Sequence, residues 1–276
     1  MKINRRQFLA GVGAAGAAVG VDAFGLEAHR VLLSRHEVRI PGLPTGLDGL
    51  RIAQVSDVHF PGNQLAARAA LDLLQQERPD IVVLTGDMTE SREAMGDVRS
   101  FAADARGSLA TVALLGNWEH RAGAVGRLAV DTYRSAGVEL LVNQSKTVDV
   151  GGVPLTLVGL DDPVAGSAKL SEARQSVVQG STEIWLVHAP GVVDSMSESM
   201  QPLPALVLAG HTHGGQIRIP LVPPVKPIGA GRFLEGWYYD TFAPLYVSRG
   251  VGTTGIPARF RCPAELPLFT LRAGAP

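Results

Sequence analysis

Short runs of mostly apolar residues, each followed almost at once by an aspartate, asparagine or histidine, recur along this chain. Five such runs occur, at residues 51–56, 81–84, 111–115, 183–187 and 205–209. Their length and nearly continuous apolar character are typical of strands that are buried on both faces. Stretches with helical periodicity lie between several of them. This alternation predicts an α/β fold with a mainly parallel sheet that is covered on both faces.

The sequence between the strands predicts the remaining elements. We expect longer helices at residues 64–77, 91–105 and 121–136, and shorter ones at 168–178 and 192–199. Residues 146–150 and 153–159 flank Gly151-Gly152, which is typical of a hairpin turn. Residues 220–236 are rich in proline and glycine and predict a long loop. No repeat or long linker divides the chain, so we expect one domain over residues 36–272.

The first thirty residues have the composition of a targeting segment. Arg5 and Arg6 precede Phe8-Leu9, and a run of Gly, Ala and Val without charge follows at residues 10–21. This pattern resembles a twin-arginine signal, which implies the twin-arginine export machinery and a periplasmic or cell-envelope location. No Ala-x-Ala cleavage site follows the run. Membrane association through a retained N-terminus therefore stays open.

Composition excludes several classes of function. Lys and Arg number 25 against 26 Asp and Glu, and no basic cluster follows the first six residues, so we expect no nucleic-acid binding. The single cysteine, Cys262, excludes an internal disulfide and a zinc cage built from cysteines.

The side chains that close the strands are those that bind metal ions. Seven candidates occur: Asp57, His59, Asp87, Asn117, His188, His211 and His213. The carboxyl ends of parallel strands share one edge of a sheet, so these side chains can converge. Carboxylate, imidazole and amide oxygen suit divalent Mn, Zn or Fe. Seven ligands are too many for one ion with an open position, so we expect two ions, with Asp87 as the bridging carboxylate.

Five blocks, Asp57-x-His59, Gly86-Asp87, Gly116-Asn117, His188 and Gly210-His211-x-His213, resemble in their order the calcineurin-like metallophosphoesterases. The sequence at residues 210–217 is similar to the corresponding motif of the exported or membrane-associated bacterial branch of this family. The resemblance implies a two-sheet β-sandwich flanked by helices in four α/β/β/α layers. It also implies that Asp57, His59, Asp87 and His213 hold one ion, and that Asp87, Asn117, His188 and His211 hold the other.

The activity that the resemblance implies is hydrolysis of a phosphodiester or pyrophosphate by a hydroxide that bridges the two metals. A lipid-linked or envelope precursor is one candidate substrate. The alternatives are a phosphomonoesterase and a non-catalytic metal-binding envelope protein on the same scaffold.

One position departs from the family pattern. The family usually has histidine after Gly-Asn, where it is expected to assist the leaving group, and this chain has Trp118. Three interpretations stay open. His120 takes the catalytic role from two residues further on, or the substrate has a leaving group that needs no acid, or Trp118 forms an apolar wall for the substrate. We further expect Arg218, Arg232 or Arg249 to contact the phosphate.

Overall fold

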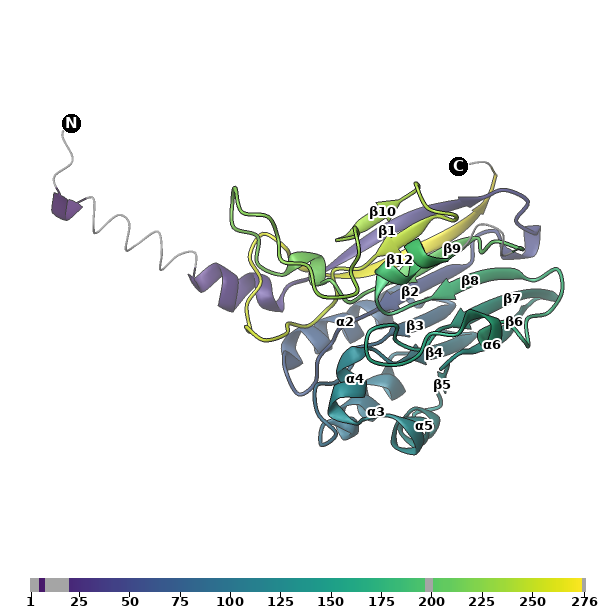
Figure 1. Cartoon of the computed structure of the whole chain (residues 1–276), viewed down its shortest axis with the longest axis horizontal. Coiled ribbons are helices and arrows are strands. Elements are labelled where there is room, and N and C mark those ends of the chain that lie inside the picture. The colour runs from purple at the N-terminus through teal and green to yellow at the C-terminus, as the bar shows by residue number, and fades with distance from the viewer. Residues whose placement is uncertain (1–4, 8–19, 197–200, 275–276) are drawn as a thin grey trace.

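Two six-stranded sheets form the centre of the molecule (Figure 1). The computed structural model describes residues 5–7, 20–196 and 201–274. The first sheet has the order β1 (Val31–Ile40), β12 (Ala264–Ala273), β2 (Arg51–Val55), β3 (Ile81–Thr85), β4 (Ala110–Leu114) and β5 (Glu139–Leu140). The second has the order β10 (Gly236–Tyr238), β11 (Leu245–Val247), β9 (Leu206–Ala209), β8 (Thr182–Leu186), β7 (Val153–Gly159) and β6 (Gln144–Val150).

Alternation along single strands explains why the chain forms two sheets. In β3, Ile81 and Val83 belong to the core between the sheets, whereas Val82 and Leu84 face the helices. In β8, Ile184 faces the first sheet and Trp185 packs on the opposite side. A strand that is covered on both faces needs apolar residues at every position. The parallel strands are as predicted, but they are divided between two sheets rather than joined in one.

The helices cover the outer faces of this sandwich. The core of the first sheet continues into α2 (Gln64–Glu77), α3 (Met95–Asp104) and α5 (Gly126–Ser135). The second sheet is covered by the short α6 (Leu170–Ala173), the 3₁₀ helix Pro190–Ser195 and the loops around them. The four-layer α/β/β/α architecture is therefore confirmed. The strands at 146–150 and 153–159 and the loop at 220–236 are also found where predicted.

Four helix predictions need correction. The predicted helix at residues 121–136 is two helices, α4 (Asn117–Ala122) and α5, because Gly123 and Gly126 take left-handed φ values of +66° and +61°. The helix predicted at 168–178 is confined to α6, and α3 begins only at Met95. The predicted helix at 192–199 is a 3₁₀ helix that ends at Ser195, and its last three residues lie outside the described part.

The fold begins earlier than predicted, because residues before 36 pack on the domain. Strand β1 starts at Val31 and pairs with β12 along its whole length. Before it, the Glu27 carboxylate accepts the backbone N–H groups of Arg261 and Cys262, and Ala28 is buried. Most of the apolar run at residues 10–21 lies outside the described residues. Within the described residues, no helix has the length and apolar character needed to cross a bilayer.

Candidate metal centre and its pocket

The predicted ligands follow five strands, β2, β3, β4, β8 and β9, at the carboxyl edges of both sheets. The backbone turns sharply where β2, β3 and β9 end. Five of the seven candidates have left-handed φ values: Asp57 (57°), His59 (58°), Asp87 (51°), His211 (74°) and His213 (50°). This conformation is unfavourable for residues with a side chain and is concentrated at functional sites. The turns bring side chains from both sheets together, as the sequence predicts.

One group of three ligands lies between β2 and β9. Asp57, His59 and His213 are buried, and one ligand atom from each lies within 4.8 Å of the others. The Nε2 atoms of His59 and His213 are 2.9 Å apart, and Asp57 Oδ1 is 3.5 Å from His213 Nε2. Three donor atoms thus point at one small volume.

A second group consists of Asp87, His188 and His211, which are also buried. His188 Nε2 lies 3.1 Å from Asp87 Oδ2 and 3.2 Å from His211 Nδ1. Asn117 Oδ1 is 3.3 Å from the same His188 nitrogen. The four predicted members of this group are therefore brought together.

Asp87 lies between the two groups. Its Oδ2 atom is 3.8 Å from His59 Nε2 and 3.1 Å from His188 Nε2. The backbone N–H of Trp118 donates to Oδ1 at 2.8 Å and holds the carboxylate in this orientation. One carboxylate oxygen of Asp87 thus lies near a histidine nitrogen of each group, which is the arrangement that a bridging ligand requires.

The outward nitrogen of two histidines has a hydrogen-bond acceptor, and that of a third lies at ion-pair distance from a carboxylate. His188 Nδ1 lies 2.8 Å from Thr85 O, His211 Nε2 lies 2.8 Å from Ile228 O, and His59 Nδ1 lies 2.9 Å from Glu90 Oε1. Such acceptors fix the tautomer and leave the inward nitrogen free to bind a cation. His213 Nδ1 is buried with no hydrogen-bond partner among the described residues. The donor set fits two divalent cations.

Electrostatics within the second group also favour a cation. Burial opposes the charge on His188, but the Asp87 carboxylate outweighs it and raises the pKa of His188 to about 10. Burial and the neighbouring His188 charge lower the pKa of His211 to about 4. For Asp87, burial works against ionisation, yet His188 brings its pKa well below the usual range. The carboxylate thus requires positive charge beside it, which a proton or a metal ion can supply.

Glu119 is a site residue that the sequence reasoning missed. Its buried carboxylate accepts four backbone N–H groups, from Gly116 at 2.8 Å, Asp87 at 3.0 Å, Met88 at 2.5 Å and Thr89 at 3.0 Å. Burial and the Asp87 charge raise its pKa to about 7. Glu119 therefore ties the turn that carries Asp87 to the start of α4. An acid three residues after a helix-capping glycine is the signal that could have indicated it.

Helix α4 also carries Trp118, His120 and Arg121. Trp118 lines the cavity, with its ring edge-on to His59 at 6.1 Å between centroids, and the Arg121 guanidinium lies over the Trp118 ring. His120 is not among the residues that line the cavity, and its Nε2 lies 2.7 Å from Asp161 Oδ1. The hydrogen bond to Asp161 raises the pKa of His120.

The arginines expected to contact phosphate are engaged elsewhere. Arg218 pairs with Glu235, Arg249 with Glu265, and Arg232 with Asp194 and Asp240. Among the described residues that line the cavity, Arg121 is the single arginine or lysine. The cation available to a substrate therefore comes from α4.

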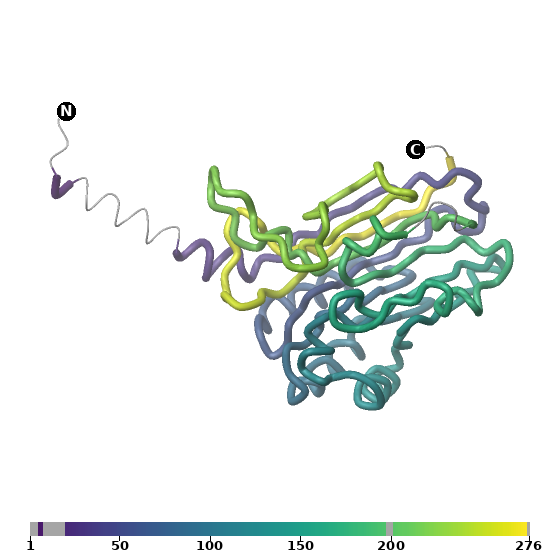
Figure 2. The backbone as a smooth tube through the Cα atoms, in the orientation of Figure 1, coloured from purple at the N-terminus to yellow at the C-terminus, as the bar shows by residue number. Residues whose placement is uncertain are grey.

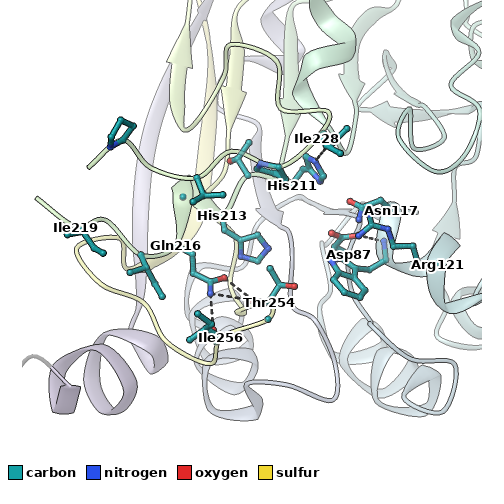
Figure 3. A pocket seen from close by; sticks show the side chains of 18 of the residues that line it. Asp87, Asn117, Arg121, His211, His213, Gln216, Ile219, Ile228, Thr254 and Ile256 are labelled. Atoms are coloured by element: carbon teal, nitrogen blue, oxygen red, sulfur yellow. Dashed lines mark hydrogen bonds between the residues drawn. The ribbon is translucent and has the colours of Figure 1, made fainter. Parts of the chain in front are cut away.

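The ligands open into a cavity of about 620 Å³. In Figure 3, Asp87, Asn117 and Arg121 lie on one side of it, Ile219 and Ile256 on the other, and His211 and His213 between them. A polar wall with metal ligands thus faces a wall of aliphatic side chains.

Buried carboxylate and imidazole groups at the strand ends of a two-layer sandwich define a metal-dependent hydrolase of phosphoric esters. Residues 50–219 match the calcineurin-like phosphoesterase superfamily domain, and the chain belongs to this superfamily.

Two curated relatives cover most of the chain. An uncharacterized metallophosphoesterase of Bacillus subtilis, YkuE, is 29% identical over 99% of both chains. Phosphodiesterase YaeI of Escherichia coli is 29% identical over 80% of this chain and 82% of its own. Among solved structures, the 5′-nucleotidase precursor of Thermus thermophilus aligns with a TM-score of 0.46 and 15% identity, over 74% of this chain and 49% of that chain.

Proposed function

We propose that this metallophosphoesterase hydrolyses phosphodiesters, with pyrophosphate-linked substrates as the second candidate. The observation that carries the proposal is the pairing of the metal ligands with one arginine and an extended apolar wall in the same cavity. A diester has one negative charge and two organic groups, whereas a monoester has up to two charges and one organic group. One guanidinium and ample apolar surface match the diester better, and the relative YaeI is named a phosphodiesterase.

We assign the ligands to two ions on the distances within the two groups. Asp57, His59, Asp87 and His213 would hold one ion, and Asp87, Asn117, His188 and His211 would hold the other; Mn, Zn and Fe all accept this donor set. When bound, such a pair of cations neutralises phosphoryl charge and activates water as a Lewis acid. Around them, Trp118 and Arg121 would orient the ester, and Glu119 would hold the turn that carries Asp87.

Proton delivery to the leaving oxygen is the second part of the proposal. We propose His120 for this role, because its hydrogen bond to Asp161 raises its pKa and so favours the protonated form that a general acid needs. His120 does not line the cavity, so the alternatives to this assignment are a leaving group that needs no acid and an apolar role for Trp118.

The activity is tested with bis-p-nitrophenyl phosphate and p-nitrophenyl phosphate, and metal content is measured on the same sample. We expect about two ions per chain and a higher kcat/KM for the diester. Asp87→Ala should abolish turnover and metal loading together. A faster monoester reaction would indicate a phosphomonoesterase. Two ions without turnover of either compound would indicate a non-catalytic metal-binding protein.

The role of His120 is tested by varying the leaving group. His120→Ala should reduce hydrolysis of a diester with an unactivated phenol by about 10²-fold or more, and change the p-nitrophenyl diester far less, because general acid catalysis is worth about 10²–10⁴-fold. Equal effects on both diesters would remove His120 from the mechanism.

We also propose export through the twin-arginine pathway, on the basis of Arg5-Arg6 and the uncharged run that follows. Replacement of both arginines by lysine should retain the protein in the cytoplasm of a bacterium with this pathway. Unchanged export, measured by cell fractionation, would contradict the assignment.

A further inference from the structure

An apolar rim lies at the mouth of the cavity. We call it the collar, and it consists of Ile219, Leu221, Val222, Val225, Ile228 and Ile256. All six side chains are exposed: Leu221 fully, Ile228 by 84% and Val225 by 79%. Five of the six also line the cavity, so the collar is continuous with the site.

The collar is not the outer surface of a packed core. Five of its residues lie in the segment 219–228, which contains neither helix nor strand. Prolines at 220, 223, 224 and 227 restrict the backbone of this segment. Leu221 has a left-handed φ of 67°, a conformation that favours glycine, while its side chain is fully exposed. Contiguous exposed apolar surface of this kind marks a docking or ligand site.

The collar adjoins the N-terminal segment through a series of hydrogen bonds. The segment 216–218 pairs with residues 254–260, where Arg218 N–H donates to Phe260 O and Gln216 Nε2 to Ile256 O. Residue Arg259 in turn donates its backbone N–H to Ala23 O. Figure 2 shows the N-terminal segment leaving the body at the same end as these two loops.

The sequence that leads into this end is itself apolar and uncharged, at residues 10–21. Val21, Phe24 and Leu26, where the chain reaches the body, are exposed as well. The exposed apolar side chains of Val21, Phe24 and Leu26 and the collar therefore lie at the same end of the molecule.

The charge of the collar loops is positive. Residues 216–230 and 254–262 contain Arg218, Lys226, Arg259 and Arg261 and no aspartate or glutamate. Arg218 pairs with Glu235 and Arg259 is buried, so the exposed charge comes from the other two. Lys226 and Arg261 are exposed. Exposed basic residues beside apolar side chains are suited to an anionic membrane surface.

We propose that the collar inserts into the interface of a lipid bilayer, and that the substrate is an amphiphilic phosphoester drawn from that bilayer. The substrate class rests on the proposed function, whereas the insertion does not. The apolar part of the substrate lies against Ile219, Val222 and Ile256, while its phosphate reaches the ligands on the opposite wall. Insertion buries side chains that the fold leaves in water, and it brings the mouth of the cavity to the lipid headgroups.

The docking is tested on the full chain with a fluorophore at the collar. Cys262 is buried, so Leu221→Cys can be labelled selectively with an environment-sensitive dye. The matched control is Leu109→Cys, an exposed leucine just before β4 and therefore at the edge opposite the ligands. With vesicles of phosphatidylethanolamine and phosphatidylglycerol, the dye at 221 should shift to the blue and lose most of its emission when the acyl chains are brominated. The dye at 109 should do neither.

Three results would overturn the docking. If the protein binds vesicles but the emission of the dye at 221 does not change, the leader alone attaches the protein to the membrane. A blue shift without vesicles that grows with protein concentration would assign the collar to a second copy of the chain. A blue shift without vesicles that does not depend on protein concentration would show that the chain's own leader covers the collar.

The substrate class is tested with two diesters that share a leaving group, methyl and dodecyl p-nitrophenyl phosphate, below the micelle concentration. In both, water adds at phosphorus and p-nitrophenolate leaves. We expect a kcat/KM at least about tenfold higher for the dodecyl ester, because burial of two methylene groups already corresponds to that ratio. Ile219→Ser with Val222→Ser should reduce the ratio. Equal values for both esters would refute the amphiphile, whereas no turnover of either would refute the proposed function and leave the fluorescence result to decide the docking.

Discussion

The two walls of the cavity differ in how their side chains are held. On the polar wall, the ligands are buried, and most have a second partner in the protein, such as Thr85 O for His188 and the Trp118 N–H for Asp87. On the collar, Leu221, Val225 and Ile228 extend into solvent. The side chains of the polar wall are held in place by the fold, whereas those of the collar are exposed and contribute nothing to its core.

The difference separates reaction from recognition. Catalysis requires ligands held to within fractions of an ångström, and a hydrogen-bonded turn at the end of a buried strand provides this. Contact with a fluid apolar partner requires exposed surface in the right place, and a proline-rich loop provides that.

Glu119 offers the largest test of the polar wall. In the wild type, each carboxylate oxygen of Glu119 accepts hydrogen bonds from two backbone N–H groups. In Glu119→Gln, an NH₂ group replaces one of these oxygens and cannot accept, so about two of the four hydrogen bonds are lost. We expect a loss of about 2–4 kcal/mol in the free energy of unfolding. We also expect a fall of roughly 10²-fold in kcat/KM, because the turn that carries Asp87 shifts. Denaturant unfolding and diester hydrolysis measure the two effects.

The exposed Glu139, paired with Lys146, provides the matched control. Glu139→Gln should change both quantities little, since exposed ion pairs contribute about 0–1 kcal/mol. Wild-type activity and metal content in Glu119→Gln would show that Glu119 does not position the site.

This contrast also explains what the sequence could predict. The ligand set was accessible because apolar runs give the strands, and the strand ends give the edge where Asp87 and His211 meet. Glu119 was missed because its role depends on four backbone N–H groups that converge only in the folded chain. Strand β1 was missed because half of its pattern is polar and its partner, β12, lies over 220 residues away. The collar was missed because a loop has no periodicity from which exposure can be inferred.

Uptake of metal ions should depend on pH through the polar wall. With its pKa raised to about 10, His188 is protonated at neutral pH in the ion-free protein, and a cation must displace that proton. The apparent affinity for Mn²⁺ should therefore fall about tenfold for each unit that pH is lowered from 8 to 6, for each proton displaced. His211, with a pKa of about 4, is already neutral in this range and adds no further dependence.

Calorimetric titration of chelator-treated protein at three pH values measures this slope, and two buffers of different ionisation enthalpy give the protons released. An affinity that stays constant from pH 6 to 8 would mean that His188 does not exchange a proton for an ion.

The smallest expected effect is that of a Leu→Ala substitution in the collar. It distinguishes the walls most directly, because the same substitution can be made beside the ligands and its effect on the free energy of unfolding compared. Leu208 lies buried in β9, the strand that leads to His211, and Leu221 lies exposed in the collar. Leu208→Ala should reduce the free energy of unfolding by about 2–5 kcal/mol, through lost burial and the cavity it leaves. Leu221→Ala should change it by less than about 0.5 kcal/mol, as is usual for a surface position.

Denaturant unfolding of the two variants under the same conditions gives both values. A loss at Leu221 as large as that at Leu208 would make the collar part of the folding core, and the distinction between the walls would fail. A negligible loss would mean that folding gains nothing from this leucine. Its free energy of burial would then be available to a partner outside the chain, which is what insertion into a bilayer requires.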